Sequence, residues 1–436
     1  MSSLKIKRVV FKASRALAVI FTVTVVVPVY LASWQDTTQK PIGTPKVAQT
    51  VDTTPKIVND VDQSTSDPPQ SRTVWGLLQD DSRISTFAHW VGQFDDIVGG
   101  LDTPQARFTL FAPTNEAFAQ ESFEHGLPWF YWKFLVGYHM GPGNSSAAAL
   151  RTQNTVQSFV NADIFFKYKQ RISVQTVDPG HDGDDDEKEI TLNRHSTVIV
   201  PDQKAINGYV HLVDRVLFLP ESTTHILRSH DEFATFREAL TKTVDLAVLV
   251  NDTSTHIGQT IFAPTEAAFA KLGRKANQFF FGTGGEDYLR ALLAYHIVAN
   301  QTLFSDVYFQ EDGRGQLPVD TDSQIVLPSL ITDQGLNITV QPAKGPGHRQ
   351  SVQVNSRVPL AIPDLVAMDG VVHGIDTILV PPAVDSDKDQ DDESSGSQNR
   401  PWLSRFFDWS AGTAEETLTV DQWIERLQPL VGELRV

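Results

Sequence analysis

Four histidines stand in two recurring settings whose residue types could support acid–base chemistry. One pair follows a tyrosine at the end of an apolar run, and the other pair lies three residues before an aspartate. A histidine held by a carboxylate can act as a general base toward a nucleophile, and converging imidazoles can bind a metal ion. The residues concerned are Tyr138, His139, His211, Asp214, Tyr295, His296, His373 and Asp376.

The sequence supplies no further part for either chemistry. It contains no cysteine, no serine in a Gly-x-Ser-x-Gly setting and no His-Glu-x-x-His sequence. A structural role must be filled in every copy of a repeat, whereas a catalytic role need not be. We therefore interpret these side chains as hydrogen-bonding groups that fix how a helix meets a strand, and we expect no catalytic residue, metal or cofactor. A lumenal hydrolase that uses a Tyr-His-Asp cluster is the alternative.

Four asparagines stand in Asn-x-Ser/Thr sequences, which accept N-linked glycans in secreted proteins. Because all four lie outside the strongest apolar runs, we expect a glycoprotein. The sites are Asn144, Asn251, Asn300 and Asn337.

One sequence pattern occurs twice in the chain, and it predicts the strands and helices that must position these residues. Thr109–Phe118 and Thr260–Phe269 each read as an apolar strand that ends at a proline and leads through a threonine into a helix. That threonine, Thr114 or Thr265, can cap the free N–H groups of the helix. Tyr-His pairs and Asn/Asp-Gly segments follow in the same order, so the sequence indicates an internal duplication.

These motifs together resemble the fasciclin-like (FAS1) domain family over residues 73–382. The family's strand with Phe-Ala-Pro-Thr, its Tyr-His pair and its Asn-Gly-Val-Val-His-x-Ile-Asp segment are present in both copies. The departures are Asp369 in place of Asn, Tyr209 in place of Val, and Gly137 before the first Tyr-His pair. The resemblance implies an α+β fold: two tandem domains, each a seven-stranded β-wedge or sandwich with packed helices.

The resemblance also implies a candidate adhesion site. In animal relatives an Asp followed by Ile or Leu, shortly before the Asn-Gly segment, is linked to cell-surface receptors. Asp364 and Leu365 occupy that position in the second copy, whereas Asp202 and Gln203 occupy it in the first. A turn beside Pro363 is the alternative interpretation.

Composition limits the classes of partner. The formal net charge is −17, which argues against nucleic acid and against an anionic membrane surface, because both bind through cationic contacts. The absence of cysteine excludes a disulfide framework and a thiolate zinc site. Core packing must therefore stabilise the protein.

The ends of the chain differ from the repeats. A basic start followed by an uncharged apolar run is typical of a secretory signal, with an uncleaved signal anchor through residues 16–33 as the alternative. At the other end, Thr419 and Gln422 form a capping-box pattern ahead of an amphipathic run, which predicts a helix that docks on the second repeat or on a partner. The predicted organisation is a signal peptide or anchor at 1–33, a disordered spacer at 34–72, domain 1 at 73–220, domain 2 at 221–382, an acidic linker at 383–400 and a helical tail at 401–436.

From these features we expect a non-enzymatic glycoprotein of the secretory pathway, located in the vacuole or at the cell surface. It would act through protein or glycan contacts, in adhesion or in organisation close to a membrane. A membrane-anchored vacuolar accessory in trafficking or fusion is the alternative. Cysteine-free tandem domains with acidic and Ser/Thr-rich spacers look most like fungal members of the family.

Overall fold

The computed structural model describes most of the chain from residue 72 to residue 432, and both repeats fall within one compact unit that begins at Asp67. The signal or anchor segment, nearly all of the spacer, the acidic linker and residues 401–417 of the tail lie outside the described residues. The described ranges are 72–121, 127–160, 169–177, 188–252, 257–310, 316–320, 323, 325–331, 334–341, 349–382 and 418–432.

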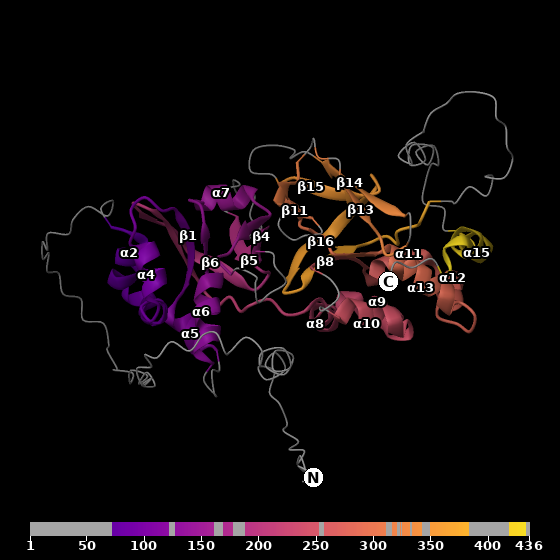
Figure 1. Ribbon diagram of the computed structural model, residues 1–436, viewed down its shortest axis with the longest axis horizontal. Coiled ribbons are helices and arrows are strands. Elements are labelled where there is room, and N and C mark those ends of the chain that lie inside the picture. The colour runs from indigo at the N-terminus through magenta and orange to yellow at the C-terminus, as the bar shows by residue number, and fades with distance from the viewer. Residues whose placement is uncertain are drawn as a thin grey trace, which may run out of the picture. The chain divides into compact units, whose positions relative to one another are not determined.

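In the first repeat, short helices precede the first strand, connect it to the second strand and follow the second strand (Figure 1). Its elements are α2 (Val74–Asp80), η4 (Ser82–Ile84), α3 (Ser85–Val91), α4 (Asp95–Leu101), β1 (Phe108–Pro113), α5 (Asn115–Ala119), α6 (Trp129–Tyr138), β2 (Met140–Pro142), α7 (Ala147–Thr152), β3 (Thr155–Gln157), β4 (Arg171–Val177), β5 (Glu189–Leu192), β6 (Ser196–Ala205) and β7 (Gly208–Val213).

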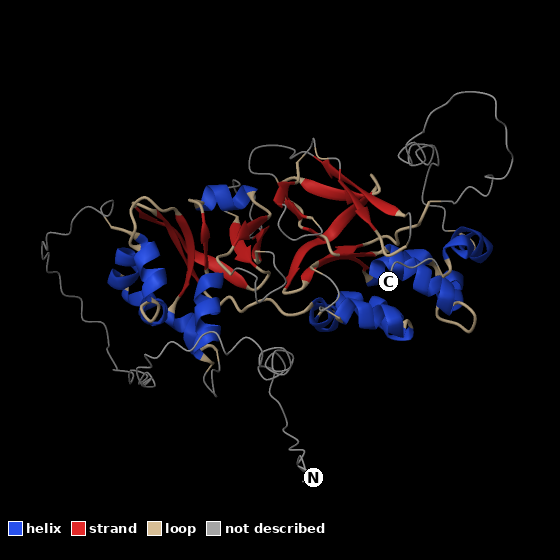
Figure 2. Cartoon of the chain, viewed as in Figure 1, coloured by secondary structure: helices blue, strands red, loops and turns tan. Residues whose placement is uncertain are grey.

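The second repeat follows the same plan, and its helices gather along one side of its strands (Figure 2). Its elements are α8 (Thr223–Ser229), η6 (Asp231–Phe233), α9 (Ala234–Lys242), α10 (Val244–Asn251), β8 (Gln259–Pro264), α11 (Glu266–Leu272), α12 (Arg274–Phe280), α13 (Glu286–Tyr295), β9 (Ile297–Ala299), β10 (Thr302–Leu303), β11 (Val307–Phe309), β12 (Gln316–Pro318), β13 (Ile325–Pro328), β14 (Gly335–Gln341), β15 (Ser351–Val354), β16 (Val358–Ala367) and β17 (Gly370–Ile375), and the tail adds α15 (Val420–Leu427) and η8 (Gln428–Leu430).

The two repeats have the same sheet topology. The strand order is β2-β1-β7-β6-β5-β4-β3 in the first and β13-β14-β15-β16-β17-β8-β9 in the second, which is the same order read in reverse. In each sheet the first long strand pairs in parallel with the last, β1 with β7 and β8 with β17, and the other pairs are antiparallel. The expected α+β fold with two seven-stranded units is therefore confirmed.

The parallel pairs explain the glycine of the Asn/Asp-Gly motif. A Cβ atom built on Gly208 would lie 2.1 Å from the backbone oxygen of Phe108, and one on Gly370 would lie 2.2 Å from that of Gln259. Both distances are far below 3.0 Å, closer than non-bonded contacts of real Cβ atoms. Glycine is required here because the two backbones approach closely, not because of the turn alone.

The residue before each glycine ties the repeat's first helix to its sheet. In the first repeat, the Asn207 amide donates to the carbonyls of Leu101 and Thr103 at 2.8 and 3.0 Å, and its oxygen accepts from the Val74 N–H at 2.8 Å. In the second repeat, Asp369 accepts from the backbone N–H and hydroxyl of Thr223 at 2.7 and 2.9 Å and from the Gln259 amide at 3.2 Å. The three groups around Asp369 all donate, which suits a carboxylate and explains this departure from Asn.

Helix α6 is less buried than its aromatic sequence predicts. Its later residues, including Trp132 and Tyr138, lie in the core, but Trp129 and Phe130 at its start are 52% and 46% exposed. Trp132 stacks on Trp90 with ring centroids 3.7 Å apart, so one face of the helix packs on α3. The first turn is exposed because aromatic residues on every side of a helix cannot all reach a core that lies on one side.

The tail helix docks on the second repeat. Thr419 and Gln422 form the predicted capping box at the start of α15. Trp423 and Leu427 join the core of the second repeat, where the Trp423 ring meets the Phe280 ring edge-on at 5.5 Å between centroids. The Arg426 guanidinium donates to the Pro381 carbonyl at 3.1 Å. The amphipathic face that the sequence predicted for this helix is thus covered within the chain.

We predict that Trp423→Ala will release the tail and lower the free energy of unfolding of the second repeat by about 2 kcal/mol. Truncating a buried aromatic costs about 3–5 kcal/mol when the cavity remains, but here the loss is limited because α15 can detach. Faster proteolysis after residue 382 and faster hydrogen exchange in α15 would show the release. Glu425→Ala, an exposed change on the same helix, should leave both unchanged; a similar release in that variant would contradict the prediction.

Among the described residues, no helix is long and apolar enough to cross a membrane. The predicted signal or anchor segment, 16–33, lies outside the described residues.

Candidate functional site

The Tyr-His histidines hold the end of a helix against the sheet. The Nδ1 atoms of His139 and His296 each lie 2.8 Å from a carbonyl one turn earlier, that of Leu135 or Leu292. Their Nε2 atoms accept from the backbone N–H of Leu217 and Leu379, both at 2.9 Å. Nδ1 therefore carries the proton, and each ring is neutral with both nitrogens engaged. Burial lowers the pKa of both imidazoles to about 4.

The strand histidines have the opposite tautomer. His211 and His373 accept through Nδ1 from the N–H groups of Asp202 and Asp364, at 3.2 and 3.1 Å. Their Nε2 atoms donate to backbone carbonyls of Ser145 and Leu303 at 2.9 and 2.7 Å. Burial lowers the pKa of both rings, that of His373 to about 4. All four histidines of the two motifs are 0% exposed, so none offers a ring nitrogen to a substrate or a metal ion.

The tyrosines and aspartates of the motifs bond elsewhere. The hydroxyl of Tyr138 donates to the Arg171 carbonyl at 2.8 Å and accepts from the Asn193 amide at 2.8 Å. Tyr295 likewise accepts from Asn355 at 3.1 Å. Asp214 accepts from the Thr197 N–H at 2.6 Å, and Asp376 accepts from the Thr265 hydroxyl at 2.6 Å. Within the described ranges, these hydrogen bonds do not join a Tyr, a His and an Asp of the motifs into one catalytic set.

The candidate adhesion pair lies in the interior. Asp364 is 2% exposed and Leu365 is 6% exposed. Asp364 has a left-handed backbone, with a φ of 56°, and its carboxylate accepts from the backbone N–H and hydroxyl of Ser305. Burial, reinforced by the nearby charge of Asp306, raises its pKa to about 7. Asp202 has the same backbone conformation in the first repeat, with a φ of 58°, but is exposed.

The four asparagines of the glycosylation sequences lie at or near the surface. Asn144 and Asn251 are exposed, whereas Asn300 and Asn337 are half-buried. Asn144 precedes α7, Asn251 ends α10, and Asn337 lies within β14. Each side chain is therefore within reach of solvent.

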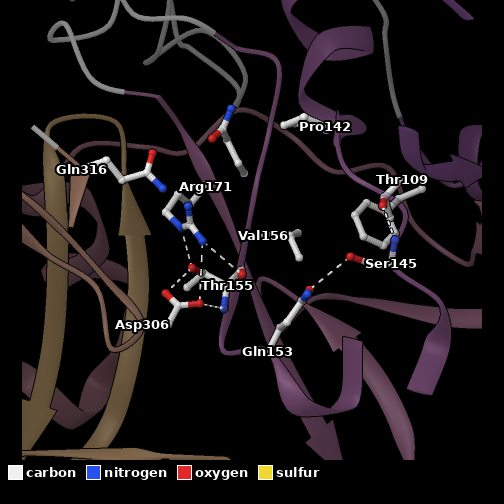
Figure 3. Close-up of a pocket in the computed structure, with 12 residues that line it drawn as sticks. Thr109, Pro142, Ser145, Gln153, Thr155, Val156, Arg171, Asp306 and Gln316 are labelled. Atoms are coloured by element: carbon white, nitrogen blue, oxygen red, sulfur yellow. Dashed lines mark hydrogen bonds and ion pairs between the residues drawn. The ribbon is translucent and has the colours of Figure 1, made fainter. Parts of the chain in front are cut away.

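A polar pocket of about 320 Å³ lies where the first repeat meets the hairpin strands β10 to β12, which have no counterpart among the described residues of the first repeat (Figure 3). The first repeat supplies most of its wall, and the second supplies Asp306 and Gln316. The lining residues are Thr109, Phe111, Gly141, Pro142, Ser145, Gln153, Thr155, Val156, Gln157, Arg171, Asp306 and Gln316.

Arg171, Thr155 and Asp306 form the polar floor of this pocket, as Figure 3 shows. Asp306 accepts from the N–H and the hydroxyl of Thr155 at 2.8 and 2.6 Å. The Arg171 guanidinium donates to the same hydroxyl at 2.5 Å and lies 3.7 Å from the Asp306 carboxylate. Burial lowers the pKa of Arg171, and the charges of Asp306 and Asp364 oppose that effect. The floor thus presents paired charges of opposite sign.

A second arginine fastens the two repeats beside this pocket. The Arg349 guanidinium of the second repeat donates to the carbonyls of Leu150, Arg151 and Val174 in the first. Across the same boundary, the Gln170 amide donates to the Met368 carbonyl at 3.0 Å. These polar contacts hold the two walls of the pocket together.

The pocket was not predicted from the sequence. Its glutamines and threonines form no motif, and its two walls lie about 150 residues apart in the chain. One signal was present: Arg171 begins a strand in which apolar residues alternate with polar ones, and a charged side chain on a strand that packs into a core needs a partner.

The same organisation is found in known proteins. The Fasciclin domain family matches residues 82–220 and 231–381 of this chain. The Aurofusarin biosynthesis cluster protein S of Gibberella zeae is 37% identical over 444 residues, which cover 98% of this chain and 99% of that protein. A Fasciclin-like arabinogalactan protein of Arthroderma benhamiae is 28% identical over 190 residues, which cover 44% of this chain and 37% of that protein.

A FAS1 domain pair from the insect cell adhesion molecule Fasciclin I matches 69% of this chain and 97% of its own, with 18% sequence identity and a TM-score of 0.35.

Proposed function

This chain belongs to the Fasciclin domain family, in two tandem copies, and from that premise we propose that it is a non-enzymatic glycoprotein of the secretory pathway. It would act through protein or glycan contacts, in adhesion or in organisation close to a membrane. It would be located at the cell surface or in the vacuole, and residues 16–33 would be a cleaved signal. In the alternative, these residues would anchor a vacuolar accessory in trafficking or fusion.

One observation supports this proposal above the others. Every histidine of the repeated motifs is a neutral, buried hydrogen-bonding group with both ring nitrogens engaged. A general base needs a free nitrogen within reach of its substrate, and a metal ligand needs a free lone pair. The groups that suggested a hydrolase thus serve the fold, which supports binding rather than catalysis.

The full-length relative favours a second candidate role. Its name assigns it to the aurofusarin biosynthesis cluster, and the alignment covers both chains almost completely. An accessory that holds biosynthetic enzymes together outside the cytosol would also act through protein contacts. We therefore include enzymes of a biosynthetic cluster among the protein partners that this chain is proposed to bind.

The cellular location can be tested with an epitope tag inserted between residues 383 and 400, in cells of the source organism. We expect the tagged protein at the cell surface, in the medium or in the vacuole, with a mobility that increases after endoglycosidase treatment. A variant with Gln at Asn144, Asn251, Asn300 and Asn337 should show no such change. Cytosolic residence, or a mobility that the enzyme leaves unchanged, would contradict the proposal.

The mode of action needs a separate measurement. Cross-linking of the tagged protein in living cells should recover defined partners, and each partner, when tagged in turn, should recover this chain. Sequencing the mature N-terminus then decides between the soluble and anchored forms. A chain that begins before residue 17 retains its anchor.

A further inference from the structure

The pocket of Figure 3 holds hydrogen-bonding groups that the fold does not use. The amide nitrogen of Gln153 makes no hydrogen bond to a described residue; its oxygen accepts from the Ser145 hydroxyl at 3.4 Å. The side-chain amides of Gln157 and Gln316 make none to any residue that the structure describes. Each amide offers both a donor and an acceptor, and all three converge on one pocket.

The charges in the pocket exclude a strongly ionic ligand. The Arg171 guanidinium lies 3.7 Å from the Asp306 carboxylate, and both groups are hydrogen-bonded to the Thr155 hydroxyl. An anion drawn to the guanidinium would face the carboxylate, and a cation drawn to the carboxylate would face the guanidinium. A neutral ligand whose groups both donate and accept hydrogen bonds avoids either repulsion.

Apolar surface completes the lining. Phe111, Val156 and Pro142 contribute carbon atoms to the wall that also carries the amides. A sugar ring has this dual character, because its hydroxyl groups lie around its edge and its C–H groups on its faces. At about 320 Å³, the pocket is at the small end of natural ligand sites, which fits about one ring.

From these features we propose that the pocket binds one neutral hexose residue, either as a free sugar or as the terminal residue of a glycan. The inference rests on the glycan part of the proposed function and deepens it, because it gives that contact a place in the structure. Gln153 and Gln157 would bond ring hydroxyls from the first repeat, and Gln316 would do so from the second. Since both repeats line the pocket, the sugar would also bridge them.

Isothermal titration of the full chain tests this proposal, after endoglycosidase treatment so that the chain's own glycans do not compete. The probes are methyl hexosides of glucose, galactose and mannose, their disaccharides, and glucuronate as an anionic probe. We expect at least one neutral hexoside to bind with a Kd of about 1 mM, typical of a small polar ligand. Tighter binding of the disaccharide would identify a glycan terminus as the source, and equal binding would identify the free sugar.

Two variants make the result specific to the pocket. The double variant Gln153→Ala/Gln157→Ala should weaken binding at least tenfold while its unfolding temperature stays unchanged. Gln341→Ala, which removes an exposed glutamine from β14 outside the pocket, should leave the Kd unchanged. Equal weakening in both variants, or tighter binding of glucuronate than of every neutral hexoside, would overturn the proposal.

Failure of this inference differs from failure of the proposed function. If no hexoside binds at a concentration of about 50 mM, far above the expected Kd, the pocket assignment is wrong. The cellular address and the cross-linked partners would stand unaffected, since they do not depend on this pocket.

Discussion

Asp364→Asn will change the free energy of unfolding, relative to the native chain, more favourably at pH 8 than at pH 4. The difference between the two pH values is on the order of 4 kcal/mol. The pKa of Asp364 is raised from its ordinary 3.8 to about 7, first by burial and then by the charge of Asp306. Between these values the folded chain keeps a proton that the unfolded chain has released. The native chain must therefore lose stability as the pH rises from about 4 to about 7, whereas asparagine, which does not titrate, removes this loss.

The surroundings of Asp364 make the effect large. Its carboxylate accepts from the Ser305 N–H at 2.8 Å, and the nearest imidazole, that of His373, is neutral and lies 4.0 Å away. The positive charge of Arg171 lowers the pKa of the carboxyl only in part. Near neutral pH the native chain thus buries an incompletely compensated carboxylate, which asparagine replaces with a neutral group of the same shape.

Urea unfolding of both proteins at pH 4 and pH 8 measures this difference. Asp202→Asn is the matched control, because Asp202 has the same backbone conformation and the same bond to a histidine in the first repeat but is exposed. Its effect should be equal at the two pH values. If Asp364→Asn also gave one constant difference, the buried carboxylate would not be the group that titrates.

The buried histidines make stability depend on pH in the direction opposite to that of Asp364. Burial lowers the pKa of His139, His296 and His373 from 6.5 to about 4, so the unfolded chain takes up protons first as the pH falls. Stability that these rings contribute above pH 6.5 is lost as the pH falls toward 4, while protonation of Asp364 acts in the other direction. The pH dependence of the native chain is therefore the sum of two effects of opposite sign, and Asp364→Asn removes only the carboxyl's part.

The sequence was sufficient to predict the repeated architecture because its main signals are local. Thr114 and Thr265 cap helices α5 and α11 as predicted, since a threonine after a strand's final proline needs no distant partner to act as a cap. Thr419 and Gln422 form their capping box for the same reason. Duplication strengthened each signal, because every motif occurs twice in the same order.

The features that the sequence did not predict depend on contacts between distant segments. The turn asparagines Asn193 and Asn355, with φ of 48° and 52°, bond the hydroxyls of Tyr138 and Tyr295 from far along the chain. Their recurrence after corresponding apolar strands was the available signal. The pocket had no such repeat, because Asp306 lies between β10 and β11, which have no counterpart among the described residues of the first repeat.

Gly208→Ala will destabilise the first repeat by at least about 4 kcal/mol, which places it among the most damaging single substitutions. The new Cβ would lie 2.1 Å from the Phe108 oxygen, and 3.0 and 3.1 Å from two more backbone atoms of Phe108. A flexible side chain could move aside, but these atoms belong to β1, which pairs with β7 in parallel along its whole length. Relief of the clash must therefore separate the pair that joins the first strand of the repeat to its last.

Gly99→Ala is the matched control for this substitution. Gly99 is exposed within α4, and a Cβ there would meet no atom within 4 Å, so alanine should stabilise that helix by about 0.5–1 kcal/mol.

Urea unfolding followed by hydrogen exchange can assign each change to one repeat. In Gly208→Ala, amides of β1 and β7 should exchange rapidly while those of β8 and β17 keep their protection. Gly370→Ala should give the reverse pattern, because its Cβ would meet the Gln259 oxygen at 2.2 Å. Protection of both parallel pairs in either alanine variant would show that the close approach does not require glycine, and the physical account of the repeated Asn/Asp-Gly motif would have to be replaced.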